Sequence, residues 1–418
     1  MNILVLGNGF DLAHNLPTKY TDFLNFINVI SQVLTTHETD KQDLNSLDWH
    51  SLHPELKKYI LNTYNSSDNN WLTSPIIKDW NKKVTNNFWF QYFEECDMHG
   101  NENWIDFETE ISHVIQKIDI RMYRHKANLY DKEQSFSNHF ANEKDSEYKL
   151  IIERIARIKS ANSKLRYKDI RDTLLTGLED LILVLEWYLT YFIANISVKT
   201  RSKDIENLHP DKVLSFNYTN TYQTLYDKKK NCTYDFIHGK ASTDVQASTN
   251  NMVLGIDEYL PKNRKNKDIT FIAFKKFYQR IYKETGCEYQ VWIEEIQSKN
   301  RSYTKEIKEC KNRLRENKGI GMEGYETRAR LKDLKTYPPK YKLYIFGHSL
   351  DITDKDILKE LILCENVYTT IFYRNREHMG ALITNLVKVI GQDRLIQKTG
   401  GSMPTIIFKK QQEMYDTF

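Results

Sequence analysis

The sequence lacks cysteine pairs at the spacing of a metal site or a disulfide framework. Its five cysteines lie far apart and form no Cys-x-x-Cys pair; they are Cys96, Cys232, Cys287, Cys310 and Cys364. This spacing argues against a structural zinc site and against a small disulfide-bonded domain. It is typical of a protein in a reducing compartment, so we expect a cytoplasmic location.

Long apolar runs and a strong excess of one charge are also missing. No run approaches the roughly 20 apolar residues that cross a bilayer, and the first residues read as a strand, not as a signal segment. We therefore expect neither secretion nor a membrane partner. The formal net charge of +4 on 418 residues is too mild to favour a nucleic-acid partner.

The sequence does contain six short apolar segments that read as buried strands. They lie at residues 2–6, 212–216, 234–237, 343–346, 368–373 and 405–408. Because long helical stretches separate them, they predict an α/β fold with a mostly parallel sheet and large α-helical insertions. We assign residues 1–20, 205–260 and 340–418 to a nucleotide-binding core, residues 21–204 to a helical insertion and residues 261–339 to a second insertion or lid.

Helical periodicity is clearest at two places in these insertions. In residues 174–196, apolar side chains recur every three or four positions and predict one amphipathic helix. Residues 271–281 carry Phe and Tyr at similar spacing and predict another helix, which could cover a pocket or form an oligomer interface. The alternative for this second helix is a stabilising lid without a regulatory role.

The first strand runs directly into Gly7-Asn8-Gly9-Phe10-Asp11. A strand that ends in Gly-x-Gly is typical of a nucleotide site, because glycine permits the sharp turn and lets backbone amides approach a phosphate. The third glycine of the dinucleotide fingerprint is absent, since Leu12 takes its place. An ordinary strand-to-helix turn, with Asp11 as a helix cap, is therefore the alternative.

Polar groups also follow three other predicted strands. They are Asn217-Tyr218, His238-Gly239 and Gly347-His348-Ser349, with Asp351 and Asp354 soon after. In open α/β sheets, ligands bind outside the carboxyl ends of the strands, so we expect these groups to share one pocket. Taken singly, Asn217 is also a common turn residue, His238 a common core histidine, and the two aspartates common helix caps.

These blocks, in this order, resemble the AbiH family of bacterial abortive-infection proteins. The resemblance rests on residues 7–11, 16–20, 104–108, 215–219, 237–239 and 346–351. The family resemblance implies a role in defence against phage. It spans nearly the whole chain.

The strand-end blocks are also similar, more distantly, to those of sirtuins and sirtuin-like NAD-degrading defence proteins. That similarity implies a Rossmann-like core, a water or ribose oriented by Asn217, and His238 as the catalytic base. It assigns the ligand to Gly7, Asn8, Gly9, Phe10, Tyr218, Gly239, Gly347, His348, Ser349, Asp351 and Asp354. The zinc-binding cysteine pairs of the deacylases are missing, so protein deacylation is not expected. Thr219 replaces a frequent aspartate, which puts ribose recognition there in doubt.

The sequence therefore predicts an abortive-infection effector that binds NAD or a related nucleotide and hydrolyses its N-glycosidic bond. Asn217, His238 and Asp11 are the predicted catalytic residues, with no metal and no bound prosthetic group. Two alternatives stay open: a nucleotide-binding sensor without turnover, and an RNA or DNA nuclease. A homo-oligomer and a phage-derived trigger also stay open as partners.

Overall fold

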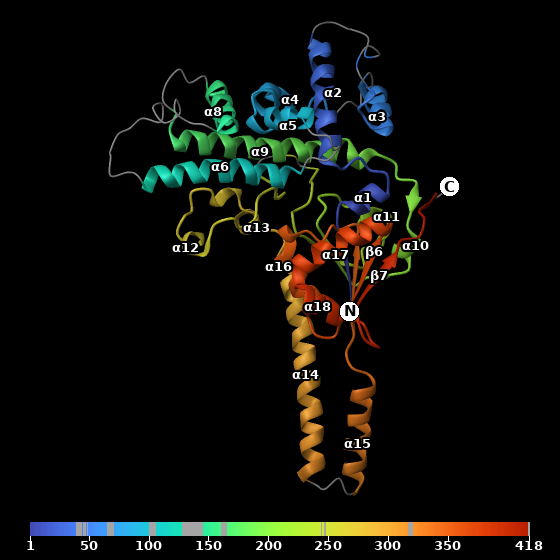
Figure 1. Cartoon of the computed structure of the whole chain (residues 1–418). Coiled ribbons are helices and arrows are strands. Elements are labelled where there is room, and N and C mark those ends of the chain that lie inside the picture. Colours follow the sequence, from blue (N-terminus) through green and yellow to red (C-terminus); the bar gives the residue numbers. More distant parts are fainter. Residues whose placement is uncertain are drawn as a thin grey trace. The chain divides into compact units, whose positions relative to one another are not determined.

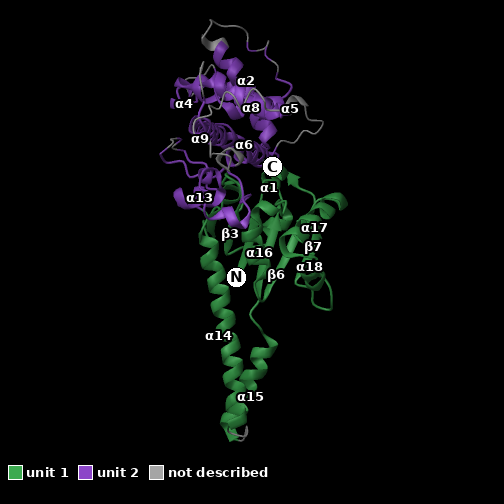
Figure 2. Cartoon of the chain, turned by 60° about the vertical axis from the view of Figure 1, so that its left-hand side comes forward, with its two compact units in different colours: residues 1–14, 199–237, 286–418 green, residues 15–198, 238–285 purple. Residues whose placement is uncertain are grey.

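The computed structural model of the chain describes residues 1–38, 44, 47, 49–64, 71–99, 106–127, 145–159, 165–243, 245, 248–316 and 321–416. These residues form two compact units (Figure 2). Unit 1 comprises Met1–His14, Lys199–Ile237 and Gly286–Phe418, and unit 2 comprises Asn15–Val198 and His238–Thr285. Trp104 and Ile105, two residues of the family resemblance, lie outside the described ranges.

Unit 1 contains a six-stranded sheet in which every neighbouring pair is parallel. Its strands are β1 (Asn2–Leu6), β3 (Lys212–Ser215), β4 (Thr233–Phe236), β5 (Tyr341–Phe346), β6 (Val367–Tyr373) and β7 (Ile406–Lys410). All six predicted strands are confirmed, and their order across the sheet is β4-β3-β1-β5-β6-β7. Leu6 pairs with Ser215 on one side and Phe346 on the other, so the central strands end level with one another.

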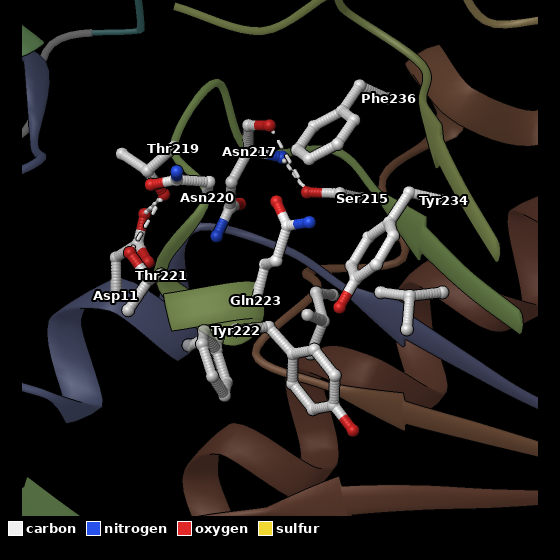
Figure 3. Close-up of a pocket in the computed structure, with 13 residues that line it drawn as sticks. Asp11, Ser215, Asn217, Thr219, Asn220, Thr221, Tyr222, Gln223, Tyr234 and Phe236 are labelled. Carbon is white, nitrogen blue, oxygen red and sulfur yellow. Dashed lines mark hydrogen bonds between the residues drawn. The ribbon is translucent and has the colours of Figure 1, made fainter. Parts of the chain in front are cut away.

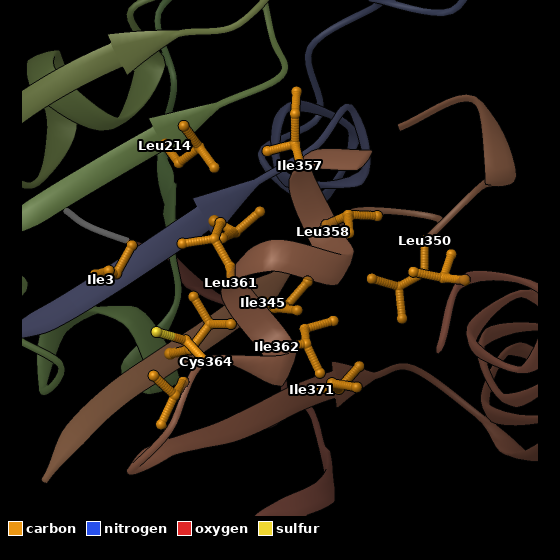
Figure 4. Close-up of a cluster of buried hydrophobic side chains, with 14 of the residues drawn as sticks. Ile3, Leu214, Ile345, Leu350, Ile357, Leu358, Leu361, Ile362, Cys364 and Ile371 are labelled. Carbon is orange, nitrogen blue, oxygen red and sulfur yellow. The ribbon is translucent and has the colours of Figure 1, made fainter. Parts of the chain in front are cut away.

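Both faces of the sheet are buried. Alternate residues of each strand point to opposite sides, and helices cover each side. Ile3 and Val5 join an apolar cluster with the helices α14 (Glu288–Glu316), α16 (Lys355–Leu363), α17 (Arg376–Ile390) and α18 (Gln392–Thr399), part of which Figure 4 shows. Leu4 and Leu6 join a second cluster with α1 (Gly9–Ala13), α10 (Lys203–Glu206) and α11 (Thr221–Leu225). The result is a three-layer α/β unit.

A long helical hairpin extends from this unit (Figures 1 and 2). The first turns of α14 pack Trp292 and Ile296 against the sheet, and the rest of the helix runs on beside α15 (Gly321–Thr336). The second predicted insertion, residues 261–339, is therefore divided: its part up to Thr285 belongs to unit 2 and the hairpin belongs to unit 1. A small antiparallel pair, β2 (Thr200–Arg201) with β8 (Tyr415–Asp416), completes unit 1.

Unit 2 is helical, and its central element is α9 (Tyr167–Tyr191). The predicted apolar face is confirmed, since Leu174, Leu178, Leu181 and Leu185 are all buried. The helix ends earlier than residue 196, in a 3-10 turn at Ile193–Asn195. Unit 2 also contains α2 (Tyr20–Glu38), α3 (Pro54–Tyr64), α4 (Pro75–Lys78), η2 (Asn81–Thr85), α5 (Phe88–His99), α6 (Phe107–Ala127), α8 (Ser146–Ile158) and α12 (Lys262–Lys265).

The helix expected over residues 271–281 is broken in two. A 3-10 turn, η4 (Ile272–Phe274), is followed by extended Lys275 and then by α13 (Lys276–Tyr282). Lys275 and Lys276 are buried and form ion pairs of 2.8 Å with Glu258 and 2.7 Å with Glu108. Backbone bonds accompany the break: the Ile256 N–H donates to the Phe274 carbonyl at 2.8 Å and the Lys276 N–H donates to the Ile256 carbonyl at 2.9 Å. The described helices of the chain are each too short or too polar to span a lipid bilayer.

The loops after β1 and β5 touch through glycines. The Gly9 N–H donates to the Gly347 carbonyl at 2.8 Å, and Gly347 has a φ of 71°. A Cβ on Gly9 would lie 2.8 Å from the Gly347 oxygen, and a Cβ on Gly347 would lie 2.2 Å from the Phe10 nitrogen. Both glycines are therefore required by the approach of one backbone to the other.

Replacing Gly347 by Ala tests this contact. The clash and the left-handed φ should together lower the free energy of unfolding by roughly 3 kcal/mol or more, measured by urea denaturation. Gly401→Ala is the matched control, since Gly401 has a φ of 80° but no atom within 4 Å of its would-be Cβ. That change should cost only about 1 kcal/mol. Equal losses in the two variants would contradict the close approach of the loops.

Candidate functional site

A hollow opens in unit 1 at the carboxyl ends of β1, β3 and β4, beside α11 (Figure 3). It is a small hollow that is partly open to solvent. The lining residues are Leu6, Phe10, Asp11, Val213, Ser215, Asn217, Thr219, Asn220, Thr221, Tyr222, Gln223, Tyr234 and Phe236. Three predicted site residues, Phe10, Asp11 and Asn217, thus come together here, and no lysine, arginine or histidine is among the lining residues.

Asp11 stands in the first turn of α1 with 1% of its surface exposed. Its Oδ2 accepts a 2.6 Å hydrogen bond from the Thr219 hydroxyl, which in turn accepts one from the Thr221 hydroxyl at 3.0 Å. Its buried Oδ1 has no hydrogen-bond partner among the described residues. Burial raises the pKa of Asp11 to about 6, although the polar side chains of Thr219, Thr221 and Asn217 oppose the rise. Among the residues that line the hollow, no cation therefore compensates this carboxylate.

Asn217 lies just beyond β3 and is 6% exposed. Its backbone is fixed by Ser215, whose Oγ accepts from the Asn217 N–H at 3.2 Å and donates to the Asn217 carbonyl at 3.1 Å. The side-chain Oδ1 is buried and, within the described residues, has no partner. Asn217 and Asp11 therefore each present an unsatisfied acceptor in the same hollow (Figure 3).

Aromatic side chains form the other side of the hollow. The rings of Tyr234 and Phe236 stack with their centroids 6.0 Å apart, and the Tyr234 hydroxyl donates to Asp227 Oδ2 at 2.8 Å. Tyr222 lies next to them, 6.4 Å from Tyr234 between ring centroids. Apolar walls with a few polar groups in fixed positions are typical of sites for small organic ligands.

The glycine turn does not line this hollow. Its amides are bonded inside the chain: Gly7 N–H donates to the Phe346 carbonyl at 3.2 Å, Gly9 N–H to the Gly347 carbonyl, and Phe10 N–H to the Gly7 carbonyl at 2.8 Å. Asn8 caps α1 through its carbonyl, which accepts from Leu12 N–H at 3.1 Å. The glycines are thus explained by loop packing, a reason that the sequence analysis missed, and their phosphate role stays a prediction.

The residues after β5 form a bonded cluster of their own. His348 is buried: its Nδ1 accepts from Leu350 N–H at 2.9 Å, and its Nε2 lies 3.4 Å from Asp354 Oδ2. Its ring meets the Phe216 ring edge-on, with centroids 4.3 Å apart. Asp351 accepts from Thr353 N–H at 3.0 Å, so the helix-cap interpretation is confirmed for this residue. Its predicted ligand contact, like those of the exposed Ser349 and of Asp354, stays a prediction.

His238 and Gly239 belong to unit 2. His238 is buried, and its carbonyl accepts from Val253 N–H at 2.7 Å. Gly239 has a φ of 75° and packs tightly on Asn251. The hollow is formed by unit 1 alone, so the pairing of His238 with Asn217 stays a prediction. Tyr218 is half-buried and is not one of the lining residues.

Sequence reasoning missed Thr219, Thr221, Gln223 and Tyr234 as lining residues. In the resemblance to sirtuins Thr219 is a departure from an expected aspartate, yet in the structure its hydroxyl donates to Asp11. The signal that could have found it is the run of hydroxyl and amide residues from Ser215 to Gln223, directly after a buried strand. Polar residues at the carboxyl end of a parallel strand face the ligand-binding edge of a sheet.

Residues 3–373 of the chain match the family model described as AbiH, bacteriophage abortive infection. No curated protein and no solved structure matches the chain.

Asp11→Asn should stabilise the protein at neutral pH. Folded Asp11 keeps its proton up to a pH of about 6, whereas an unfolded carboxyl releases it near 4, so the stability of the protein falls as the pH rises from about 4 to about 6. The substitution removes this penalty, and the free energy of unfolding at pH 7 should rise by roughly 2 to 3 kcal/mol. At pH 4 the variant and the native protein should unfold at nearly the same urea concentration.

Asp227→Asn is the control with the opposite sign. Burial favours its neutral form, but hydrogen bonds from Asn231 N–H, the Tyr234 hydroxyl and Cys232 N–H outweigh that effect and lower the pKa of Asp227. Its replacement should therefore destabilise the protein at pH 7. If Asp11→Asn also lowered stability at pH 7, the uncompensated buried carboxylate would be refuted.

Proposed function

We propose that this chain, which belongs to the AbiH family of bacteriophage abortive infection proteins, is an anti-phage effector. In this proposal it binds a nucleotide in the hollow and hydrolyses the N-glycosidic bond of that nucleotide. NAD is the first candidate for the nucleotide. The observation that carries the proposal is the buried Asp11 carboxylate with one unpartnered oxygen in a hollow that no cationic residue lines.

The order of the strands supports a nucleotide ligand. Numbered along the chain, the six strands stand in the order 3-2-1-4-5-6, which is the order of Rossmann-type dinucleotide-binding folds. In such folds the ligand lies outside the carboxyl ends of the strands, around the switch point between the first and fourth strands, here β1 and β5. The hollow opens beside that point, at the carboxyl ends of β1, β3 and β4. This topology is the argument for a Rossmann-like core.

The charge of the hollow favours a nicotinamide nucleotide. Asp11 lacks a cationic partner in the lining, so a ligand that brings positive charge gains a charge-assisted contact. The pyridinium ring of NAD carries that charge, and the ribose gains positive charge as the bond to nicotinamide breaks. An ionised Asp11 beside the sugar would stabilise this transition state more than the ground state. The anionic phosphates would have to lie away from Asp11, because like charges repel.

The remaining groups of the hollow fit the other parts of such a ligand. The amides of Asn217 and Gln223 offer donors and acceptors for ribose hydroxyls or for a water molecule. The Tyr234 and Phe236 rings offer a surface on which a base can stack. In this proposal Asn217 positions the water, and His238 remains the proposed base that accepts its proton.

Turnover of NAD tests the proposal. Purified protein, alone and with lysate from phage-infected cells, is incubated with NAD, and released nicotinamide is quantified by chromatography. Asp11→Asn and Asn217→Ala should each lower kcat by about 100-fold or more, since each removes a preorganised contact to the transition state. Because Asp11→Asn is expected to be more stable than the native protein, its loss of activity would not reflect unfolding.

Asp393→Asn is the matched control, since Asp393 is exposed in the first turn of α18. It should leave nicotinamide release unchanged. No release by the native protein in either condition, together with unchanged NAD in infected cells, would refute hydrolysis; NAD binding alone would then favour the sensor. Full turnover in His238→Ala would refute only the role of that residue.

A further inference from the structure

The hairpin of α14 and α15 separates its charges between two faces. The two helices meet through a half-buried to buried seam that includes Tyr303, Cys310, Thr327 and Leu334, and the Tyr303 hydroxyl donates to the Leu334 carbonyl at 3.1 Å. Figures 1 and 2 both show the helices side by side beyond the sheet. The seam fixes which side chains of each helix point outward.

On α14, one outward side is basic. At about 100° per residue, Arg301, Lys305, Lys308, Lys311 and Arg315 fall within an arc of about 120°. The other residues of this arc between positions 297 and 315 are uncharged, and all five cations are exposed. Of the acidic residues, Glu306 projects well away from this arc, whereas Glu309 and Glu316 lie within about 40° of its edge, next to Lys305.

On α15, the same separation recurs. Arg328, Lys332 and Lys335 are exposed and share one side, with no acidic residue among them. Glu323, Glu326 and Asp333 share the other side with Arg330. On each of the two helices, the exposed basic residues named above therefore share one side.

An ion pair determines how the two sides combine. Arg330 of α15 bonds to Glu306 of α14 at 2.7 Å, so the acid-bearing sides of the two helices meet on one face of the hairpin. The basic sides therefore share the opposite face. This face, which we call the basic face, consists of Arg301, Lys305, Lys308, Lys311, Arg315, Arg328, Lys332 and Lys335.

The cations of the basic face are largely uncompensated. Among the described residues, only Lys305 has an acidic group within 4.0 Å, and that pair with Glu309 is exposed and 3.9 Å long. Without these eight charges the formal net charge of the chain would fall from +4 to −4. The mild net charge therefore conceals a concentrated basic surface on a chain that is otherwise acidic.

We propose that the basic face of the α14–α15 hairpin binds the phosphate backbone of a nucleic acid duplex. The cations on α14 recur every three or four residues, about 5 Å apart along the axis, and so present a continuous row of donors to a polyanion. Tyr325, 67% exposed, lies at the edge of this face, where it can pack on sugar or base. A membrane surface fits less well, because the face carries no row of apolar side chains and the opposite face is acidic.

Fluorescence anisotropy tests the proposal. It measures the binding of labelled DNA and RNA duplexes to the full-length protein across a salt series. The double variant Lys308→Gln with Arg315→Gln should bind roughly tenfold more weakly at about 0.1 M salt. Its plot of log K against log salt should be shallower by about 2, one for each lost phosphate contact. Both side chains are exposed, so folding should be preserved. Circular dichroism checks the folding of this variant and of the control.

The matched control is Lys299→Gln with Arg313→Gln, which removes the same two residue types from the acid-bearing side of the same helix. It should retain the native affinity and salt dependence. Three results would overturn the proposal: no binding of either duplex at low salt, equal weakening in both double variants, or binding to anionic phosphatidylserine vesicles without binding to the duplexes. A preference for one duplex would identify the nucleic acid.

Discussion

The contact between the loops after β1 and β5 is the constraint on which the candidate site depends. The Gly9 N–H bonds to the Gly347 carbonyl, and neither residue has room for a side chain, so α1 must begin directly beyond the central strand. Asp11, in the first turn of α1, is thereby held beside the residues that follow β3, where the Thr219 hydroxyl meets it. One extra residue in the turn would shift the carboxylate by about 1.5 Å along the helix and rotate it by about 100°, out of the hollow.

This geometry keeps Asp11 in an unfavourable state. Its carboxyl is buried and accepts a short hydrogen bond from the Thr219 hydroxyl. Burial penalises the charged form and raises the pKa of Asp11 to about 6. Asp204, also buried, is compensated: Lys409 and the Gln412 N–H both bond to it. A group that lowers stability in this way is typical of a functional site, where a ligand supplies the missing partner. In the proposed complex the ligand, and not a lining residue, carries the positive charge that faces Asp11.

The sequence predicted the sheet well because its strands are buried on both faces and read as short apolar runs between helices. It predicted Asp11 and Asn217 at the strand ends for the same reason. It could not predict that Gly7 and Gly9 serve loop packing, since that depends on Gly347, more than three hundred residues away. Nor could it divide residues 261–339 between the two units, because helical periodicity shows which side of a helix is buried and not what covers it. The break at Lys275 could not be predicted for a related reason: there the backbone pairs with Ile256, in an earlier segment, and helical periodicity does not show such pairing.

The net charge of this protein does not show how its charges are distributed. Composition sums the charges of the whole chain, whereas the structure places them on particular faces. Sixty basic and 56 acidic residues nearly cancel, so the sequence favours no polyanionic partner. Two helices paired antiparallel sort the same charges by side, and one ion pair, Arg330 with Glu306, fixes which sides coincide. Electrostatic attraction of a polyanion depends on the potential at the surface that it meets, which decays over about 10 Å at 0.1 M salt, and not on the net charge of the chain. A row of cations about 20 Å long is therefore attractive to phosphates even on a chain that is acidic elsewhere.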